Sequence, residues 1–206
     1  ALHLSTLHTV DEQMHFSSSS PASSGKNLEI ARTTIKTMAS IFSGNKIPNI
    51  GETILGDSYN IGPGGKGCNQ AIAIARLGGK VSFISKLGKD SYADLALKTL
   101  GENNINSTSI TQSPNLQTGV AGIMLDKKTG KNAINVITGA PSTFTISEIE
   151  KHINTIKNSK IFLTQLEVPK NISFYCLKTA KENNVITILN PAPAAEISKE
   201  FFSKRI

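Results

Sequence analysis

Apolar and small residues recur along most of the chain in short segments that predict alternating helices and strands. Strands are predicted over residues 81–87, 119–125, 133–138, 160–165 and 185–189. Helices are predicted over residues 69–77, from Asp90 to about Gly101, and over 145–158 and 172–182. Strands that alternate with helices imply crossover connections and a mainly parallel sheet flanked by helices, so we predict an α/β fold.

Local signals agree with these boundaries. Thr145 and Glu148 have the spacing of a capping box, and Pro169 stands where the first turn of a helix tolerates proline. The polar segment 126–131 contains Gly130 and joins two β-rich runs, which is typical of a hairpin. We therefore expect a small β hairpin over about 118–138 that stands apart from the parallel sheet.

The first 37 residues have a different character. They contain the run Ser17 to Ser20, further serines and no sustained apolar period. We predict a disordered Ser-rich lead over residues 1–37, without the apolar segment of a secretory signal, followed by one α/β domain over 38–206. Because no apolar run approaches the roughly 20 residues of a membrane-spanning helix, we expect no membrane partner.

Composition narrows the range of functions. The 22 Lys and Arg residues exceed the 15 Asp and Glu residues, giving a net charge of +7. The basic residues are scattered and aromatic residues make up only 5%, a pattern that favours lysine-rich surfaces over nucleic-acid binding. A small phosphorylated substrate remains compatible with this charge. Cys68 and Cys176 lie far apart without metal-ligand spacing, so we expect neither a disulfide framework nor a zinc site.

Two polar residues close predicted strands. Glu167 follows the apolar run ending at Gln165, and Asn190 follows the run 185–189. Ligands of open α/β sheets gather beyond the carboxyl ends of the strands, so both residues are candidates for a binding site. The alternative is that they are solvated strand ends or turn residues.

The loop from Gly62 to Gly67, GPGGKG, is the strongest local signal. A loop without side chains lets backbone N–H groups approach a polar or anionic ligand. It does not fit a Walker A loop, because Gly67 follows Lys66 where that motif needs Ser or Thr. It fits a dinucleotide fingerprint poorly, because polar residues precede it and Lys86 closes the next strand. A site for a hydroxyl-rich ligand is the third interpretation, with Asn69 offering both a donor and an acceptor.

Five ordered segments resemble the ribokinase, or PfkB-type, carbohydrate kinase family. They are Gly51-Glu52-Thr53; the segment from Pro63 to Ala71 with Ala75-Arg76-Leu77-Gly78 and Gly88-Lys89-Asp90; Thr118-Gly119; Gln165 to Pro169; and Leu189 to Ala194. The resemblance covers residues 51–195. It implies a ribokinase-like fold and transfer of the ATP γ-phosphoryl group to the 5-hydroxyl of D-ribose.

The resemblance also implies the site. Sugar contacts are expected from Gly64, Gly65, Lys66, Asn69 and Glu167. The β hairpin is expected to form a lid over the sugar and the interface of a homodimer. The family's first strand carries an Asn/Asp pair that grips the sugar, but the stretch from Met38 to Gly51 contains no Asp, and Asn45 is the candidate substitute.

The catalytic part is expected elsewhere. The family's catalytic Asp belongs to a Gly-Ala-Gly-Asp motif, which we expect beyond Ile206, so no catalytic residue is assigned to this chain. ATP, Mg²⁺ and a monovalent cation such as K⁺ are implied by the family, with their sites mostly outside this chain. We therefore interpret the chain as the amino-terminal two-thirds of a cytoplasmic sugar kinase, without phosphorylation activity of its own and poorly soluble. The alternatives are a non-catalytic sugar-binding or interaction protein and, third, a dinucleotide-binding protein.

Overall fold

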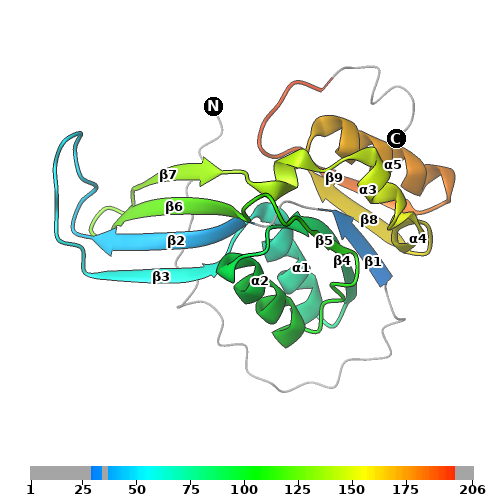
Figure 1. The fold of residues 1–206 in the computed structure, drawn as a ribbon, viewed down its shortest axis with the longest axis horizontal. Helices are drawn as coiled ribbons and strands as arrows, with labels where there is room; N and C mark the ends of the chain where they lie inside the picture. The colour runs from blue at the N-terminus through cyan, green and yellow to red at the C-terminus, as the bar shows by residue number, and fades with distance from the viewer. Residues whose placement is uncertain (1–28, 34–36, 198–206) are drawn as a thin grey trace.

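The computed structural model describes residues 29–33 and 37–197, which form an α/β body and a sheet that projects from it (Figure 1). The body contains a five-stranded sheet in the order β5-β4-β1-β8-β9, in which every neighbouring pair is parallel. The strands of the body are β1 (Glu29–Thr33), β4 (Lys80–Leu87), β5 (Ile110–Gln112), β8 (Ile161–Gln165) and β9 (Ile186–Asn190). The predicted mainly parallel α/β fold is confirmed.

Helices cover both faces of this sheet because successive strand residues point to opposite sides. On one face, Val81 and Phe83 of β4 pack against α1 and α2. On the other face, Ile84 of β4 and Phe162 of β8 pack against α3, α4 and α5. The helices are α1 (Lys66–Arg76), α2 (Ser91–Glu102), η1 (Ala140–Thr143), α3 (Ile146–Glu150), α4 (Ile153–Lys157) and α5 (Lys170–Glu182).

The second sheet, which we call the projecting sheet, extends away from the body (Figure 1). Its order is β3-β2-β6-β7, with bounds β2 (Thr37–Gly44), β3 (Ser58–Pro63), β6 (Gly119–Asp126) and β7 (Asn132–Ile137). β6 and β7 form the predicted antiparallel hairpin. The hairpin is not a separate element, however, because β2 pairs with β6 in parallel and β3 completes the sheet.

The predicted boundary of the Ser-rich lead is wrong at its C-terminal end. Residues 29–33 form β1 at the centre of the body sheet, where Ile30 and Ala31 are buried between β4 and β8, and Thr37 already belongs to β2. The remainder of the predicted lead, residues 1–28 and 34–36, lies outside the described residues. The family's first strand was expected in the stretch from Met38 to Gly51, but that stretch begins with β2 of the projecting sheet, and the first strand of the body sheet is β1.

One predicted helix is divided. Thr145 and Glu148 form the predicted capping box at the start of α3, but α3 ends at Glu150 and α4 begins at Ile153, with His152 between them as an N-cap residue. Both short helices still bury one isoleucine each, Ile149 and Ile156, against the sheet. The apolar spacing thus predicted the buried face and missed the break.

Two features of the outer surface bear on partners. Within residues 29–33 and 37–197, no helix has the length and apolar character to cross a membrane. The edge strand β9 exposes Ile186 and Ile188 on the sheet face opposite Leu189, which packs on α5. Among the described residues, no strand pairs with the outer side of β9, so this edge of the body sheet is unpaired there and has an apolar strip beside it.

Candidate functional site

The glycine loop connects the projecting sheet to the body. β3 ends at Pro63, Gly64 is buried, and Gly65 is the N-cap of α1 with φ +82°. This left-handed backbone favours glycine and turns the chain directly into the helix. Gly65 has no side chain to cap α1, and the first turn of α1 has no acidic residue. The helix therefore requires an acceptor from elsewhere in the chain.

Glu167 supplies that acceptor from the end of β8. Its Oε2 accepts a hydrogen bond from the Lys66 backbone N–H at 2.9 Å, and its Oε1 lies 3.3 Å from Lys66 Nζ. A carboxylate at a helix N-terminus is stabilised by the helix dipole as well as by these bonds. Two residues 101 positions apart in the sequence thus form one charged group at the carboxyl end of the sheet.

The turn that carries Glu167 is fixed on both sides. Leu166 and Val168 are buried, and the Leu166 N–H donates to the Ala192 carbonyl at 3.0 Å. Just before the turn, the Gln165 side-chain amide donates to Gln70 on α1. Glu167 therefore stands on a rigid turn with its side chain directed at the start of α1, which suits a preorganised binding group.

The site is open to ligands. The Lys66 side chain is 44% exposed and that of Glu167 is 15% exposed. Asn69, on the first turn of α1, is exposed, and its side chain has no hydrogen-bond partner among the residues that the structure describes. An amide with unused donor and acceptor groups beside a glycine loop and a carboxylate can bind a molecule rich in hydroxyl groups.

The predicted site residues are thus brought together with one exception. Gly64, Gly65, Lys66 and Asn69 form the loop and first helical turn, and Glu167 contacts Lys66. Asn45 lies elsewhere. β2 runs away from the glycine loop, since Met38 pairs with Pro63 and Ser43 with Ser58. Seven residues of strand place Asn45 about 23 Å beyond Met38. The prediction that Asn45 joins this site is wrong.

The other polar residue predicted at a strand end, Asn190, occupies that position. It closes β9 and pairs with Gln165 of β8, while its carbonyl accepts a hydrogen bond from Ala192 at 2.7 Å. Ala192 is the residue that holds the turn of Glu167. Asn190 is therefore linked to the turn of Glu167 through backbone hydrogen bonds of Ala192.

The dinucleotide interpretation of the glycine loop is wrong. That fingerprint needs a parallel strand of the central sheet immediately before the loop. The strand before this loop is β3, an antiparallel partner of β2 in the projecting sheet. The strand that leads into α1 therefore belongs to the projecting sheet and not to the parallel sheet of the body.

The loop segment Gly51-Glu52-Thr53 has a local role. Glu52 accepts hydrogen bonds from the backbone and side-chain amides of Asn49 at 3.0 and 3.1 Å, and it pairs with Lys46. These contacts lie at the far end of the projecting sheet, beside a cavity of about 520 Å³ lined by Phe42 and Tyr59. A second cavity, of about 420 Å³, lies between Gly79 and Asn104. Neither cavity is lined by the site residues.

The cysteines carry no reactive group for this site. Cys68 and Cys176 are both buried and form no disulfide. Burial, with a smaller contribution from Glu150, raises the pKa of Cys176 to about 12. The Cys176 thiol is therefore protonated at neutral pH and is a weak nucleophile.

A second ion pair fixes α3 to the carboxyl end of β4. Lys86 Nζ lies 2.7 Å from Glu148 Oε1 and 3.3 Å from the Thr143 carbonyl, and both side chains are largely buried. Burial acts to raise the pKa of Glu148, but hydrogen bonds from Lys86 and Thr145 outweigh it and lower that pKa. Lys86, at the end of the strand that follows the glycine loop, therefore has a structural partner.

This pair predicts a pH dependence. Because the folded-state pKa of Glu148 lies below its ordinary value of 4.5, the stabilisation is present above pH 4.5 and is lost as the pH falls through the lower, folded-state pKa. Glu148→Gln should lower the free energy of unfolding at pH 7 by about 1–3 kcal/mol, since Lys86 is left buried without its anion. Denaturant unfolding between pH 3 and 7 measures both effects.

Glu150, which is exposed on the same helix, provides the control. Glu150→Gln should leave the pH profile of the wild type nearly unchanged, whereas Glu148→Gln should flatten it. Equal profiles for the two variants would contradict a stabilising Glu148.

The sequence and fold were compared with known proteins. The model of the pfkB carbohydrate kinase family matches residues 35–203. Mouse ribokinase is 34% identical over 160 residues, which cover 77% of this chain and 49% of that protein. The deoxyribokinase of Salmonella typhimurium is 34% identical over 150 residues, covering 73% of this chain and 49% of that protein. The chain thus spans about half the length of the curated relatives it matches.

A solved structure agrees in fold. Arabidopsis thaliana ribokinase, determined in complex with ribose and ATP, superposes with a TM-score of 0.71 at 26% sequence identity. The superposition covers 81% of this chain and 54% of that one.

Proposed function

This chain belongs to the pfkB family of carbohydrate kinases, and from this membership we propose that it binds D-ribose as the sugar-binding part of a ribokinase. In the proposed reaction, the whole protein transfers the γ-phosphoryl group of ATP to the 5-hydroxyl of D-ribose. The observation that carries the proposal is the contact between Lys66 and Glu167 beside the glycine loop. The site presents the held carboxylate of Glu167 and the side-chain amide of Asn69 to one ligand.

Each residue has a separate task in this proposal. Glu167 is already held by two donors from Lys66, and its remaining lone pairs accept hydrogen bonds from sugar hydroxyls. Asn69 donates to one hydroxyl oxygen and accepts from another. Gly64 and Gly65 let the sugar approach the backbone. These residues bind and orient the pentose, and orientation is the main requirement of phosphoryl transfer.

ATP and metal are proposed to bind outside this group of residues. Among residues 29–33 and 37–197, no group of three or more His, Cys, Asp or Glu side chains is arranged to hold a metal ion. We assign the described residues no step in the transfer itself. We propose that the sites for ATP, Mg²⁺ and a monovalent cation are formed by other parts of the whole protein.

We further propose that the whole protein is a cytoplasmic homodimer whose interface includes the projecting sheet, which also serves as the lid of the sugar site. One face of this sheet supports the interface. Phe42, Tyr59 and Met124 lie on neighbouring strands of that face, and each is at least 42% exposed. Phe42 and Tyr59 stack with their ring centroids 6.5 Å apart. Exposed apolar patches of this kind mark interaction surfaces.

Calorimetry with D-ribose tests the sugar-binding proposal. The 206-residue chain should bind ribose with measurable heat, and Asn69→Ala should weaken binding about 30-fold, because two hydrogen bonds near 1 kcal/mol each are lost. Asn171→Ala is the matched control, since Asn171 is likewise exposed on the first turn of a helix. A folded chain that binds no ribose would overturn the proposal.

A coupled assay separates a sugar-binding part from a complete kinase. We expect no ribose-dependent ADP formation by the purified chain, in the presence of Mg²⁺ and K⁺, even when calorimetry detects ribose. ADP formation that depends on ribose would overturn the assignment of catalysis to residues outside this chain. A non-catalytic sugar-binding protein would also bind ribose without forming ADP. The same assay on the whole protein tells the two apart, because only a ribokinase would form ADP.

A further inference from the structure

The projecting sheet is tied to the body at a junction on its β6–β7 side. The chain leaves the body at Thr118, just before β6, and returns at Gly139, just after β7. Asp90, the N-cap residue of α2, faces this junction. Its Oδ1 accepts a hydrogen bond from the Ala93 N–H at 2.8 Å, and its Oδ2 accepts one from the Thr118 N–H at 2.7 Å. One carboxylate thus joins the start of α2 to the start of β6.

Further backbone contacts close the junction. The Gly88 N–H donates to Thr118 Oγ1 at 3.0 Å, and the Ala140 N–H donates to the Gln117 carbonyl at 2.8 Å. A Cβ atom on Gly88 would lie 2.5 Å from the Leu116 carbonyl oxygen and 2.7 Å from the Thr118 nitrogen. The turn before α2 therefore lies in direct contact with the crossing chain, and both segments of the hairpin are held there.

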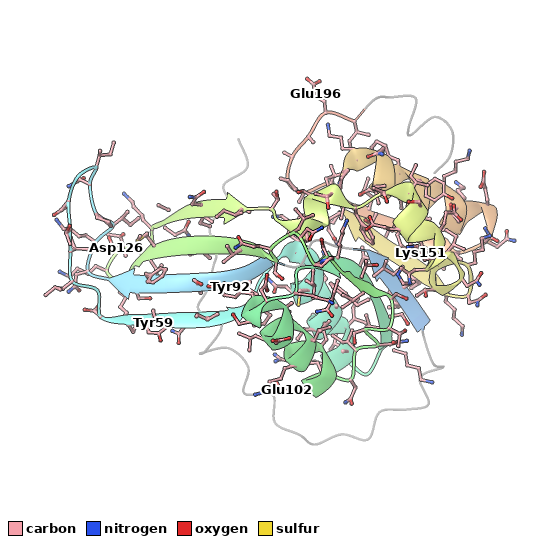
Figure 2. All side chains as sticks on the ribbon, in the orientation of Figure 1. Tyr59, Tyr92, Glu102, Asp126, Lys151 and Glu196 are labelled. Carbon is pink, nitrogen blue, oxygen red and sulfur yellow. The ribbon has the colours of Figure 1, made fainter. Side chains whose placement is uncertain are left out.

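α2 also packs against β2, on the other side of the projecting sheet from β7. Met38 of β2 is fully buried against Ala93 and Ala96 of α2. Tyr92 lies where α2 meets this sheet (Figure 2), with its hydroxyl 3.3 Å from Ser40 Oγ. The sheet thus rests on α2 through β2 and is bound to the N-terminus of α2 through β6.

The charge of Asp90 suits two simultaneous donors. Burial acts to raise the Asp90 pKa, but the hydrogen bonds from Thr118 and Ala93 outweigh it and lower that pKa. A carboxylate offers acceptors on both oxygens, whereas an amide offers one acceptor and one donor group. Asparagine could therefore replace Asp90 as a helix cap and would turn an NH₂ group toward the Thr118 N–H.

We propose that Asp90 is a positioning residue that fixes the orientation of the projecting sheet over the glycine loop. The sheet meets the body through β3, which runs into Gly64 and Gly65, through β2, which packs on α2, and through the Asp90–Thr118 junction. A junction that is held sets the angle of the sheet about the glycine loop. The segments Gly88-Lys89-Asp90 and Thr118-Gly119, which the sugar site leaves unexplained, meet in this junction. The part of the proposal that concerns the pentose rests on the proposed function, and the anchor itself does not.

Hydrogen exchange of the 206-residue chain tests the anchor. In Asp90→Asn, the Thr118 and Gly119 amides should exchange at least tenfold faster, while the α2 amides change less than threefold, because Asn and Asp cap helices about equally well. Asp94→Asn, an exposed position on the same turn of α2, should change neither set. Equal acceleration in α2 and at Thr118 would reduce Asp90 to a helix cap and overturn the proposal.

Asp90→Ser provides the same comparison if Asp90→Asn does not fold, since serine also caps helices but has no second oxygen in place of the Oδ2 that accepts from Thr118. Ribose calorimetry on the same variants tests the positioning role. We expect the Kd for ribose to rise fivefold to tenfold while the Lys66–Glu167 contact stays intact. Faster exchange with unchanged ribose affinity would overturn the positioning role. If the wild type binds no ribose, the proposed function fails, while the exchange result still decides the anchor.

Discussion

Replacement of Glu167 by alanine is expected to weaken ribose binding by roughly 10- to 150-fold, the equivalent of one hydrogen bond to a charged group at about 1.5–3 kcal/mol. The same change removes the acceptor of the Lys66 N–H and the anion beside Lys66 Nζ. The start of α1 then has no protein acceptor, so its first turn is expected to fray. Calorimetry with ribose and denaturant unfolding measure the two losses separately.

Glu167→Gln divides the effect into its parts. Glutamine retains one oxygen that can accept from the Lys66 N–H, but it has no charge for the ammonium group or for the sugar. Its ribose affinity should therefore lie between those of the wild type and Glu167→Ala. Glu182→Ala is the control, because Glu182 forms only an exposed pair with Lys178, a type that contributes little. A Glu167→Ala variant with wild-type ribose affinity would show that Glu167 only caps α1.

The pairing of Lys66 with Glu167 marks how far the sequence could predict the site. The glycine loop and the strand end made both residues candidates for a binding site, because strand ends of a parallel sheet converge on one edge. Their contact with the sugar was an expectation from the family resemblance. Their direct contact was not predicted. The distance between them depends on the turn that Leu166 and Val168 hold, and no periodicity in the sequence reports the geometry of a turn.

The elements predicted from residue 66 onward correspond closely to the structure because local signals mark their ends. Asp90 caps α2 as predicted, and Thr145 with Glu148 forms both halves of the capping box. β4 is buried at every residue after Lys80, and β8 begins with the apolar run Ile161 to Leu163, as is typical of strands covered on both faces. Such signals depend on neighbouring residues and can therefore be recognised in the sequence.

β1 shows where local signals fail. It has five residues, Glu29–Thr33, with apolar side chains only at Ile30 and Ala31, so no period can be recognised. It is a strand because β4 and β8 supply parallel hydrogen-bond partners on both sides. β2 and β3 were missed for a similar reason, since their alternation is weak, β2 pairs with β6 over a long sequence distance, and β3 pairs with β2. Tertiary context here decides what propensity leaves open.

Gly139→Ala is expected to destabilise the chain by about 2–6 kcal/mol, which is the second large effect. Gly139 has φ +59° and ψ −151°, a region that is nearly restricted to glycine and costs another residue about 1–3 kcal/mol. A Cβ there would also lie 2.5 Å from the Gln117 carbonyl oxygen and 2.6 Å from the Gly119 nitrogen. Those atoms belong to the backbone, so relief of the contact adds about 1–3 kcal/mol.

Gly78→Ala isolates the two contributions. Gly78 also has a positive φ, +84°, but a Cβ there meets nothing within 4 Å, so this variant carries backbone strain alone. Denaturant unfolding should therefore place Gly139→Ala well below Gly78→Ala in stability. Equal losses would mean that the chain at residues 117–119 moves aside at little cost. Such mobility would also contradict a junction that holds the projecting sheet in place, because Asp90 binds that same chain at Thr118.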